Sequence, residues 1–464
     1  MSEATYQYDL AVIGGGAGGV AAAIKAGQLK GKVLLVESGD LGGLCMNRGC
    51  VPFAHFMIAS RILGDLDLGR ELGIKTERLT KDFKTLLQRQ NDLLGFMRQG
   101  VAGMLKRNGV ETVQGKGCIA GSGAVAVGEK TFTARAIIIA AGGRWAMETP
   151  GGALPGEVFS TSDLILASGD LPKRALLFGA SPWSIEIAQF LRRFGSEASI
   201  ATPEKSLLSS ESKTIGTRLT KVLKREGIAI HTGAVISGVK KIKGGWSCEI
   251  NDSKDKAALD FDALIHPDRI AALAGLGLET VGLDPLARFI EVNERMETSV
   301  KGVYAIGDAA NPPERHYSHL ASSQGMIAAR NAMGQNISFN QKAVPRVLFT
   351  RPQIACVGLT PRQAKDAGYE VATGSAALSM NPLGMILSQQ EGAVEVVCDK
   401  KYGEVLGIHI IGESASEMAG VCAAAIQMEA TVEELARIVF PHPTLSESIG
   451  DAARDCLAQI APLR

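Results

Sequence analysis

The sequence predicts an α/β protein with two doubly wound domains, each built on a parallel sheet, and an α+β domain at its C-terminal end. Three observations predict this fold class. A strand, a glycine turn, a helix and a second strand follow one another in residues 8–37, and the same order returns in residues 175–201. From about residue 341, short strands alternate with helices instead. The 464 residues are enough for about three domains.

The individual elements follow from apolar runs and their spacing. Buried β-branched runs predict strands, and alanine- or leucine-rich stretches with helical spacing predict helices. The expected elements are a strand at 8–13, a helix at 20–28, a strand at 32–37, a helical region at 55–108, a strand at 136–143, a strand at 175–178, a helix at 185–194, a strand at 198–201 and a strand at 303–308. The expected domains are 1–150, 151–270, 271–340 (which completes the first domain) and 341–464.

Composition excludes several classes of protein. Lys and Arg number 49 and Asp and Glu 48, so the chain lacks the basic excess of a nucleic-acid-binding protein. The sequence has no apolar run of about 18 residues and no signal-peptide pattern at its start, so we expect a cytoplasmic protein without a membrane span. Eight cysteines are too few for a disulfide scaffold.

The first glycine turn has the pattern of a dinucleotide-binding loop. Gly14, Gly16 and Gly19 match G-x-G-x-x-G between a strand and a helix, and Glu37 ends the next strand. The first glycine permits a tight turn, the second lets a pyrophosphate approach the backbone, and the third lets helix and strand pack closely. The helix N-terminus offers N–H groups to the phosphates, and Glu37 can accept hydrogen bonds from a ribose.

Two cysteines lie close together soon after this unit. Cys45 and Cys50 belong to the segment GGLCMNRGCVP at residues 42–52. Helical spacing of five positions, with a local distortion, can bring the two thiols within disulfide reach. A disulfide in the cytoplasm is usually catalytic, and the further ligands that a zinc site needs do not follow in the sequence. The alternative is two unrelated buried thiols.

Five segments together resemble a known family. They are GGGAGG (14–19), GGLCMNRGCVP (42–52), TSVKGVYAIGDA (298–309), TRPQIACVGLT (350–360) and FPHPTLSES (440–448). Over nearly the whole chain, and in the same order, the sequence resembles the flavoprotein disulfide reductases, the pyridine nucleotide-disulfide oxidoreductases. Within that family it is most similar to dihydrolipoamide dehydrogenase. The resemblance implies two Rossmann-like dinucleotide-binding domains and a C-terminal dimerisation domain.

The resemblance also implies roles for individual residues. Cys50 would exchange electrons with the flavin of FAD, and Cys45 would exchange with the substrate disulfide. His442 would act as the acid–base for the thiols, Glu447 would orient its imidazole, and the histidine would reach the dithiol of the other subunit in a homodimer. The residues implied to hold FAD are Gly14, Gly16, Gly19, Glu37, Gly142, Asp308, Leu320 and Ala321. The last two would mark the start of a helix whose N-terminus points at the flavin.

Dithiol chemistry gives an independent reason to single out His442. Disulfide exchange needs thiolates, and a histidine that titrates near neutrality can take a proton from a dithiol and return it. A carboxylate such as Glu447 fixes the imidazole tautomer. Prolines on both sides, Pro441 and Pro443, stiffen the loop.

The second glycine turn departs from the family pattern. Only Gly179 remains, because Ser181 and Ser184 replace the other two glycines. Ser181 places a side chain where a pyrophosphate would approach, and Pro182 removes a backbone donor. Thr202 stands where an acid would bind the ribose of NAD. We therefore expect a degraded nicotinamide site, of which Gly179 and Glu186 remain.

Further departures lie beside the expected flavin site. Ala54 replaces the family lysine that pairs with the glutamate at Glu186, and Leu44 replaces a threonine of the G-G-T-C segment. Residues 266–269, His-Pro-Asp-Arg, replace a G-R-x-P-N turn. Loss of the lysine should alter flavin reactivity.

Three functions remain open at this point. The first is an ordinary dihydrolipoamide dehydrogenase-like enzyme, which oxidises a free or carrier-bound lipoyl dithiol through Cys45, Cys50 and FAD and reduces NAD(P). The second keeps the dithiol and flavin but uses another electron partner, such as a redox protein. The third is a non-catalytic, FAD-bound homodimeric subunit. We expect no metal and no nucleic acid partner.

Overall fold

A computed structural model describes residues 6–146, 159–160, 169–252, 256–266 and 268–460. The chain divides into two compact units. Unit 1 comprises Met1–His55, Asp82–Ala146 and Asp268–Asn340, and unit 2 comprises Phe56–Lys81, Met147–Pro267 and Gln341–Arg464. The expected boundary between residues 150 and 151, and Pro267 of the altered turn, lie outside the described residues.

Unit 1 is built on a sheet whose centre is parallel. Strands β3, β2, β1, β6 and β17 run parallel in that order, and β5 and β4 extend the sheet from β6 as antiparallel strands. The strands of unit 1 are β1 (Tyr8–Ile13), β2 (Val33–Glu37), β3 (Val110–Gln114), β4 (Gly117–Gly121), β5 (Ala124–Val127), β6 (Lys130–Ile139), β7 (Gly143–Trp145), β16 (Arg269–Ala271) and β17 (Val303–Ala305).

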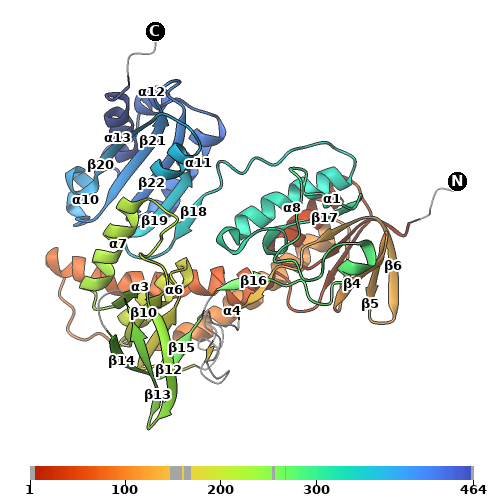
Figure 1. Cartoon of the computed structure of the whole chain (residues 1–464), viewed down its shortest axis with the longest axis horizontal. Helices are drawn as coiled ribbons and strands as arrows, with labels where there is room; N and C mark the ends of the chain where they lie inside the picture. The colour runs from red at the N-terminus through yellow and green to blue at the C-terminus, as the bar shows by residue number, and fades with distance from the viewer. Residues whose placement is uncertain (1–5, 147–158, 161–168, 253–255, 267, 461–464) are drawn as a thin grey trace. The chain divides into compact units, whose positions relative to one another are not determined.

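The helices of unit 1 place the glycine turn and the cysteines. Helix α1 lies beside α8 against the parallel strands (Figure 1). Their alanines and the apolar residues of β1, β2 and β6 form one buried cluster. The helices are α1 (Ala17–Gln28), α2 (Gly43–Arg48), α4 (Phe83–Arg107) and α8 (Ser318–Ala332), with short 3₁₀ turns η2 (Leu278–Val281), η3 (Gly307–Ala309) and η4 (Pro313–Arg315). Helix α3 (Cys50–Glu71) begins in the residues of unit 1 and ends in those of unit 2.

Unit 2 contains a second parallel sheet, of order β11-β10-β9-β15-β8, and a three-stranded antiparallel sheet. The helix α6 packs on β9 and β10. The elements are β8 (Phe159–Ser160), β9 (Arg174–Phe178), α6 (Pro182–Phe194), β10 (Glu197–Thr202), α7 (Lys213–Arg225), β11 (Ala229–Thr232), β12 (Val235–Ile242), β13 (Gly245–Asn251), β14 (Lys256–Phe261) and β15 (Ala263–Ile265).

The C-terminal part of unit 2 is an antiparallel sheet of order β18-β19-β22-β21-β20. Helix α11 packs on β19 and β22, and α13 packs on β20 and β21 (Figure 1). The elements are β18 (Arg346–Leu348), β19 (Gln353–Gly358), α9 (Pro361–Asp366), β20 (Val371–Ala377), η5 (Leu378–Met380), α10 (Pro382–Ile386), β21 (Ala393–Asp399), β22 (Val405–Gly412), α11 (Ala415–Gln427), α12 (Val432–Arg437) and α13 (Glu447–Leu457).

The predicted fold class is confirmed, with changes at the element ends. The helical region expected at 55–108 is two helices, because the polar stretch between α3 and α4 does not continue either one, and an aspartate caps the second helix. The strand expected at 136–143 begins earlier and ends at Ile139. The strand expected at 303–308 ends at Ala305, where a 3₁₀ turn follows.

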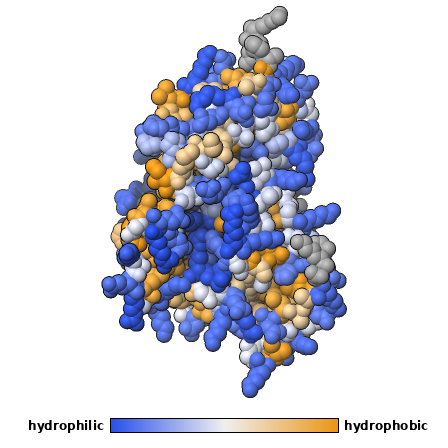
Figure 2. Space-filling view, turned by 90° about the vertical axis from the view of Figure 1, so that its left-hand side faces the viewer, coloured by the Kyte–Doolittle hydropathy of each residue, from blue (hydrophilic) through white to orange (hydrophobic). Residues whose placement is uncertain are grey.

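The surface carries hydrophilic side chains over most of the face in Figure 2, with separate apolar patches. The described helices include none that is long and apolar enough to cross a bilayer.

Candidate active site

The two cysteines flank a break between two helices. Cys45 lies in α2, and Cys50 is the first residue of α3. Between them Gly49 has φ −130° and ψ −115°, which is outside the helical region and interrupts the helical path. This is the local distortion that the spacing of five positions requires if the two thiols are to meet. Both thiols are partly exposed and reduced in the structure.

The two thiols have opposite acidities. The Cys45 thiol donates a hydrogen bond to Cys50, and this bond is the largest cause that lowers the pKa of Cys50 to about 6. The same hydrogen bond, together with burial, raises the pKa of Cys45 far above its ordinary value. The hydroxyl Oγ of Ser318, at the start of α8, lies 3.4 Å from Cys50 Sγ and also favours the thiolate. Cys50 is therefore the thiolate of the pair.

A buried arginine supplies positive charge to this site. The charge of Arg269, on β16, helps to lower the pKa of Cys50. Its guanidinium Nη1 lies 3.1 Å from Asp308 Oδ2, and its Nη2 donates to the backbone oxygen of His316 at 2.6 Å. The sequence indicated Arg269 only as part of an altered turn and did not indicate Ser318. Neither residue could be assigned to the cysteine site from the sequence, because each is more than 200 positions from Cys50.

The first glycine turn has the geometry that the motif predicts. Gly14 has φ +109°, and a Cβ there would lie 2.2 Å from the oxygen of Ala140. A Cβ on Gly19 would lie 1.8 Å from the oxygen of Gly14, so helix α1 rests directly on the turn. A Cβ on Gly16 would meet only Gly43, at 3.8 Å. The loop is thus tight at its first and last glycines and open at the middle one.

Glu37 closes this loop from the end of β2. Its Oε2 accepts from the N–H of Gly15 and its Oε1 accepts from the N–H of Gly39, both at 2.6 Å. Each carboxylate oxygen has a second lone pair that can accept a further hydrogen bond. Helix α1 begins at Ala17 without any side-chain cap, so its first N–H groups are available to a ligand.

Asp308 and the start of α8 lie in the same unit. The Asp308 carboxylate lies against the backbone at Gly143, where a Cβ would approach Oδ2 to 2.7 Å, and Gly142 has φ +70°. The imidazole of His316 lies 3.7 Å from the same oxygen, and burial lowers the pKa of His316. The helix expected to begin near Leu320 and Ala321 begins two residues earlier, at Ser318. As a result, Leu320 and Ala321 occupy its first turn, rather than its first positions.

The second glycine turn, in unit 2, is closed by its own side chains. Gly179 keeps the tight turn with φ +98°. Ser181 is the N-cap of α6: its Oγ accepts from the N–H of Ser184 at 3.4 Å and lies 3.2 Å from Ser184 Oγ. Pro182 occupies the first turn of the helix. Thr202 is fully buried, and its hydroxyl accepts from the N–H of Glu204 at 3.2 Å. The N-terminal donors that a pyrophosphate would use are partly satisfied by serine.

The glutamate of the family's lysine–glutamate pair has another partner here. Glu186, on α6, is buried, and its Oε1 accepts from the N–H of Phe349 at 2.7 Å. Ala54 lies in the first two turns of α3 and carries no charge. The cation that acts on Cys50 is therefore Arg269 rather than a residue at position 54.

His442 and Glu447 form the predicted pair. His442 Nδ1 lies 3.0 Å from Glu447 Oε1, and Glu447 Oε2 accepts from the N–H of Thr444 at 2.9 Å. The N–H of Thr444 and then His442 lower the pKa of Glu447, so this carboxylate keeps its charge below its ordinary range. The loop turns into α13, whose first residue is Glu447. The imidazole is two-thirds exposed at its surface (66%), which leaves Nε2 accessible.

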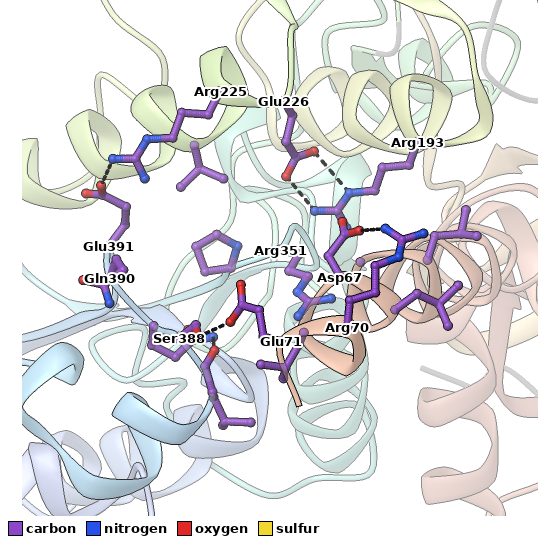
Figure 3. Close-up of a pocket in the computed structure, with 18 of the residues that line it drawn as sticks. Asp67, Arg70, Glu71, Arg193, Arg225, Glu226, Arg351, Ser388, Gln390 and Glu391 are labelled. Atoms are coloured by element: carbon purple, nitrogen blue, oxygen red, sulfur yellow. Dashed lines mark hydrogen bonds and ion pairs between the residues drawn. The ribbon is translucent and has the colours of Figure 1, made fainter. Parts of the chain in front are cut away.

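A cavity in unit 2 contains none of these residues. It lies among the end of α3, α6, α7 and residues 387–392, and charged side chains line it (Figure 3). Three ion pairs lie among them: Arg193 with Glu226, Arg225 with Glu391, and Arg70 with Asp67. Glu71, also in the lining, accepts a hydrogen bond from the hydroxyl of Ser388 at 2.8 Å.

Comparison with known proteins places the chain in a family. The family model described as pyridine nucleotide-disulphide oxidoreductase matches residues 8–335, and the model of its dimerisation domain matches residues 344–453. A dihydrolipoyl dehydrogenase of Thermus scotoductus is 35% identical over 96% of each chain. A dihydrolipoyl dehydrogenase of Bacillus subtilis is 31% identical over 96% of this chain and 97% of its own.

The chain belongs to the pyridine nucleotide-disulphide oxidoreductases. It is an FAD-dependent flavoprotein disulfide oxidoreductase of the dihydrolipoyl dehydrogenase type, with the C-terminal domain through which the family forms homodimers. Two solved structures share the fold: LpdA from Mycobacterium tuberculosis (TM-score 0.86, 22% identity, 96% and 98% of the two chains) and the Cu(II) complex of the HOCl-induced flavoprotein disulfide reductase RclA from Escherichia coli (TM-score 0.83, 21% identity, 97% and 99%).

Proposed function

We propose that this enzyme exchanges electrons between a lipoyl-type dithiol and FAD through Cys45 and Cys50, and that its electron partner beyond the flavin is not a nicotinamide nucleotide. The observation that carries the first part is the asymmetric thiol pair. Cys50, with a pKa of about 6, is a thiolate at neutral pH, whereas Cys45 holds its proton. A thiol of low pKa is a good leaving group in disulfide exchange.

The residues of unit 1 fit an FAD molecule. The open face at Gly16, the uncapped N-terminus of α1 and the Glu37 carboxylate would hold its ADP half. Asp308, Gly142 and the first turn of α8, including Leu320 and Ala321, would hold its flavin half. When bound, the flavin would supply a two-electron acceptor for the dithiol.

The exchange itself needs only the protein's sulfurs and a base. A substrate thiolate attacks Cys45 Sγ of the oxidised pair, the Cys45–Cys50 bond breaks, and Cys50 leaves as a thiolate. The second substrate thiol gives its proton to His442 Nε2, and the resulting thiolate attacks the sulfur of the substrate in the mixed disulfide. Cys45 leaves, and His442 returns the proton to it. The substrate is now a disulfide, and the pair is reduced by two electrons.

We infer that His442 and Glu447 of one subunit serve the dithiol of the other. The exposed imidazole supports this, since a base in solvent has no role in the chemistry until another surface covers it. Large apolar side chains are also exposed in the dimerisation domain: Met380, Met385, Ile386, Met428, Ile438 and Val439. Such exposed apolar groups favour an interface.

The altered second turn supports a partner other than NAD(P). The side chains of Ser181 and Ser184 hydrogen-bond to each other and to the start of α6, where the pyrophosphate would bind. The buried Thr202 has no charge with which to hold a ribose. A redox protein that docks near the flavin would need neither feature. The ordinary reading, with NAD(P) as acceptor, is the alternative that the family favours.

An anaerobic absorbance experiment tests both parts. The purified, FAD-loaded enzyme is mixed rapidly with dihydrolipoamide, NADH or NADPH, and the flavin band is followed. We expect dihydrolipoamide to bleach the band and both nucleotides to leave it unchanged. The variant Cys50→Ser is the control, because it should abolish reduction by the dithiol without removing FAD.

The two parts of the proposal can be overturned independently. Fast bleaching by NADH or NADPH would overturn the proposal about the partner and leave the dithiol chemistry intact. No bleaching by dihydrolipoamide would overturn the lipoyl-type substrate. We also propose a cytoplasmic location, because disulfides that occur in the cytoplasm are usually catalytic, as the Cys45–Cys50 disulfide would be.

A further inference from the structure

A second pair of cysteines lies in the C-terminal sheet, away from Cys45 and Cys50 in the sequence. Cys398 is on β21 and Cys456 is on α13, and both side chains are fully buried. Their Sγ atoms are 3.0 Å apart. This separation is closer than two non-bonded sulfurs usually approach and is about 1 Å longer than a covalent S–S bond. The two thiols are therefore already in contact.

A glycine brings the helix this close to the sheet. A Cβ on Gly374 of β20 would lie 2.2 Å from the backbone nitrogen of Cys456 and 2.6 Å from its Cα. Helix α13 can rest on the strand only because this position has no side chain. Two residues earlier on β20, Ala372 pairs with Cys398 of β21. The backbone contact at Gly374 thus holds Cys456 over Cys398.

The two thiols also differ in acidity. The Cys398 thiol donates a hydrogen bond to Cys456, which lowers the pKa of Cys456 and raises that of Cys398. Cys45 and Cys50 show the same division between a donor and an acceptor thiol. By contrast, burial raises the pKa of Cys422 on α11 to about 12. Cys422 is as deeply buried as the pair and provides a comparison.

We propose that Cys398 and Cys456 are a second redox site, which a peroxide converts to a disulfide that joins α13 to the sheet. Both sulfurs are buried, so the oxidant reaches them when α13 opens locally from the sheet. The Cys456 thiolate then attacks hydrogen peroxide, the O–O bond breaks, and the sulfur becomes a sulfenic acid while hydroxide leaves and is protonated to water. Cys398 then attacks that sulfur, the S–O bond breaks, a second water leaves, and the S–S bond forms. Two thiols lose two electrons, and one peroxide gains them.

The cross-link would close a loop of 58 sequence positions that runs from β21 to α13. A disulfide that closes a long loop stabilises mainly by restricting the unfolded chain. We expect the oxidised protein to melt roughly 5 °C or more above the reduced protein. The proposal does not depend on the electron route proposed for Cys45 and Cys50.

Differential alkylation tests the proposal on the full-length, FAD-loaded enzyme. The reduced protein is treated with hydrogen peroxide, free thiols are blocked with iodoacetamide under denaturing conditions, and the digest is analysed by mass spectrometry without reductant. We expect a peptide pair linked through Cys398 and Cys456 in the wild type and in Cys422→Ala, but not in Cys456→Ala. The Cys45–Cys50 link in the same digest shows that the oxidant has acted.

The thermal measurement keeps the test decisive if Cys456→Ala folds poorly, because it compares two redox states of the wild type. A linked peptide with a higher melting temperature after oxidation supports the proposal. If both cysteines are recovered alkylated while Cys45 and Cys50 are linked, the proposal is wrong. It is equally wrong if Cys456 is recovered as a sulfinic or sulfonic acid without a link.

Discussion

At the scale of single residues, two identical thiols differ because of what surrounds them. Cys50 receives a hydrogen bond from Cys45, a contact from Ser318 and the field of Arg269, and all three favour its thiolate. Cys45 is the donor of the pair and keeps its proton. The sequence shows the spacing of the two cysteines, but it cannot show which one is the thiolate, because the groups that decide this come from residues 269 and 318.

The first prediction concerns the acidity of this pair. In the reduced enzyme, thiolate at Cys50 should form with a midpoint near pH 6, so it is absent well below that pH and complete well above it. In Cys45→Ala the hydrogen-bond donor is lost, and the midpoint should rise toward the ordinary value of about 8.5. Alkylation of Cys50 by iodoacetamide, measured by mass spectrometry as a function of pH, gives both midpoints.

A matched variant separates the thiol donor from the arginine. Arg269→Gln should raise the midpoint less than Cys45→Ala, because the charge of Arg269 is a smaller cause than the hydrogen bond from Cys45. An unchanged midpoint in Cys45→Ala would contradict the assignment of Cys45 as donor.

The second prediction concerns Glu447. The N–H of Thr444 and then His442 lower its pKa, so it is a carboxylate at neutral pH. Glu447→Gln should slow dihydrolipoamide oxidation by roughly 10- to 100-fold, because the imidazole loses the carboxylate that fixes its tautomer and orientation. Steady-state rates of dihydrolipoamide oxidation measure the effect.

An exposed carboxylate in the same domain provides the control for Glu447. Glu433, on α12, pairs with Arg437, whereas the carboxylate beside His442 is that of Glu447. Glu433→Gln should leave the rate unchanged. An equal loss in both variants would point to a general effect on the domain rather than to the imidazole.

At the scale of elements, the glycine turn before α1 shows how backbone packing determines which positions of a sequence motif must be glycine. Gly14 and Gly19 are required by backbone contacts within the protein, whereas Gly16 faces open space. The motif could therefore be predicted from sequence, since each glycine has a separate steric reason. The start of α8 could be predicted only approximately, because no capping side chain marks its N-terminus.

The third prediction tests this packing. Gly19→Ala places a methyl group against the oxygen of Gly14, which overpacks the turn and should destabilise the protein by about 1–3 kcal/mol, with loss of FAD. Gly100, inside α4, has no atom within 4 Å of the position of a Cβ. Gly100→Ala should stabilise the protein by roughly 0.5–1 kcal/mol and retain FAD. Urea unfolding and the flavin absorbance of the purified variants measure these effects, and equal behaviour of the two would contradict the steric argument.

The second turn shows the limit of motif reasoning at this scale. The loss of two glycines predicts a weakened nucleotide site, and in the structure the serines cap α6 and satisfy its first donors. Sequence alone could indicate the loss, but the replacement role is visible only in the structure. The same holds for Glu186, which remains in place but accepts from the backbone of Phe349.

At the scale of the whole molecule, the order of motifs along the chain was enough to predict the fold class, because each domain has its own pattern of strands and helices. The pairing of Cys398 with Cys456 could not be predicted, since 58 positions separate them and only the contact at Gly374 brings them together. Likewise, one chain contains all four catalytic candidates, and only the resemblance to the family, not their spacing, implies that one subunit's histidine serves the cysteines of the other.

Complementation between inactive variants answers that question. Cys45→Ser and His442→Ala should each be inactive as homodimers. If the active site combines the dithiol of one subunit with the histidine of its partner, a mixed dimer has one site with both lesions and one intact site. After subunit exchange in an equal mixture, half of the dimers are mixed, so activity should return to about a quarter of the wild-type value. If each subunit used its own histidine, no site in the mixed dimer would be intact and no activity would return. Dihydrolipoamide-driven bleaching of the flavin is the readout, since it requires no assumption about the final electron acceptor.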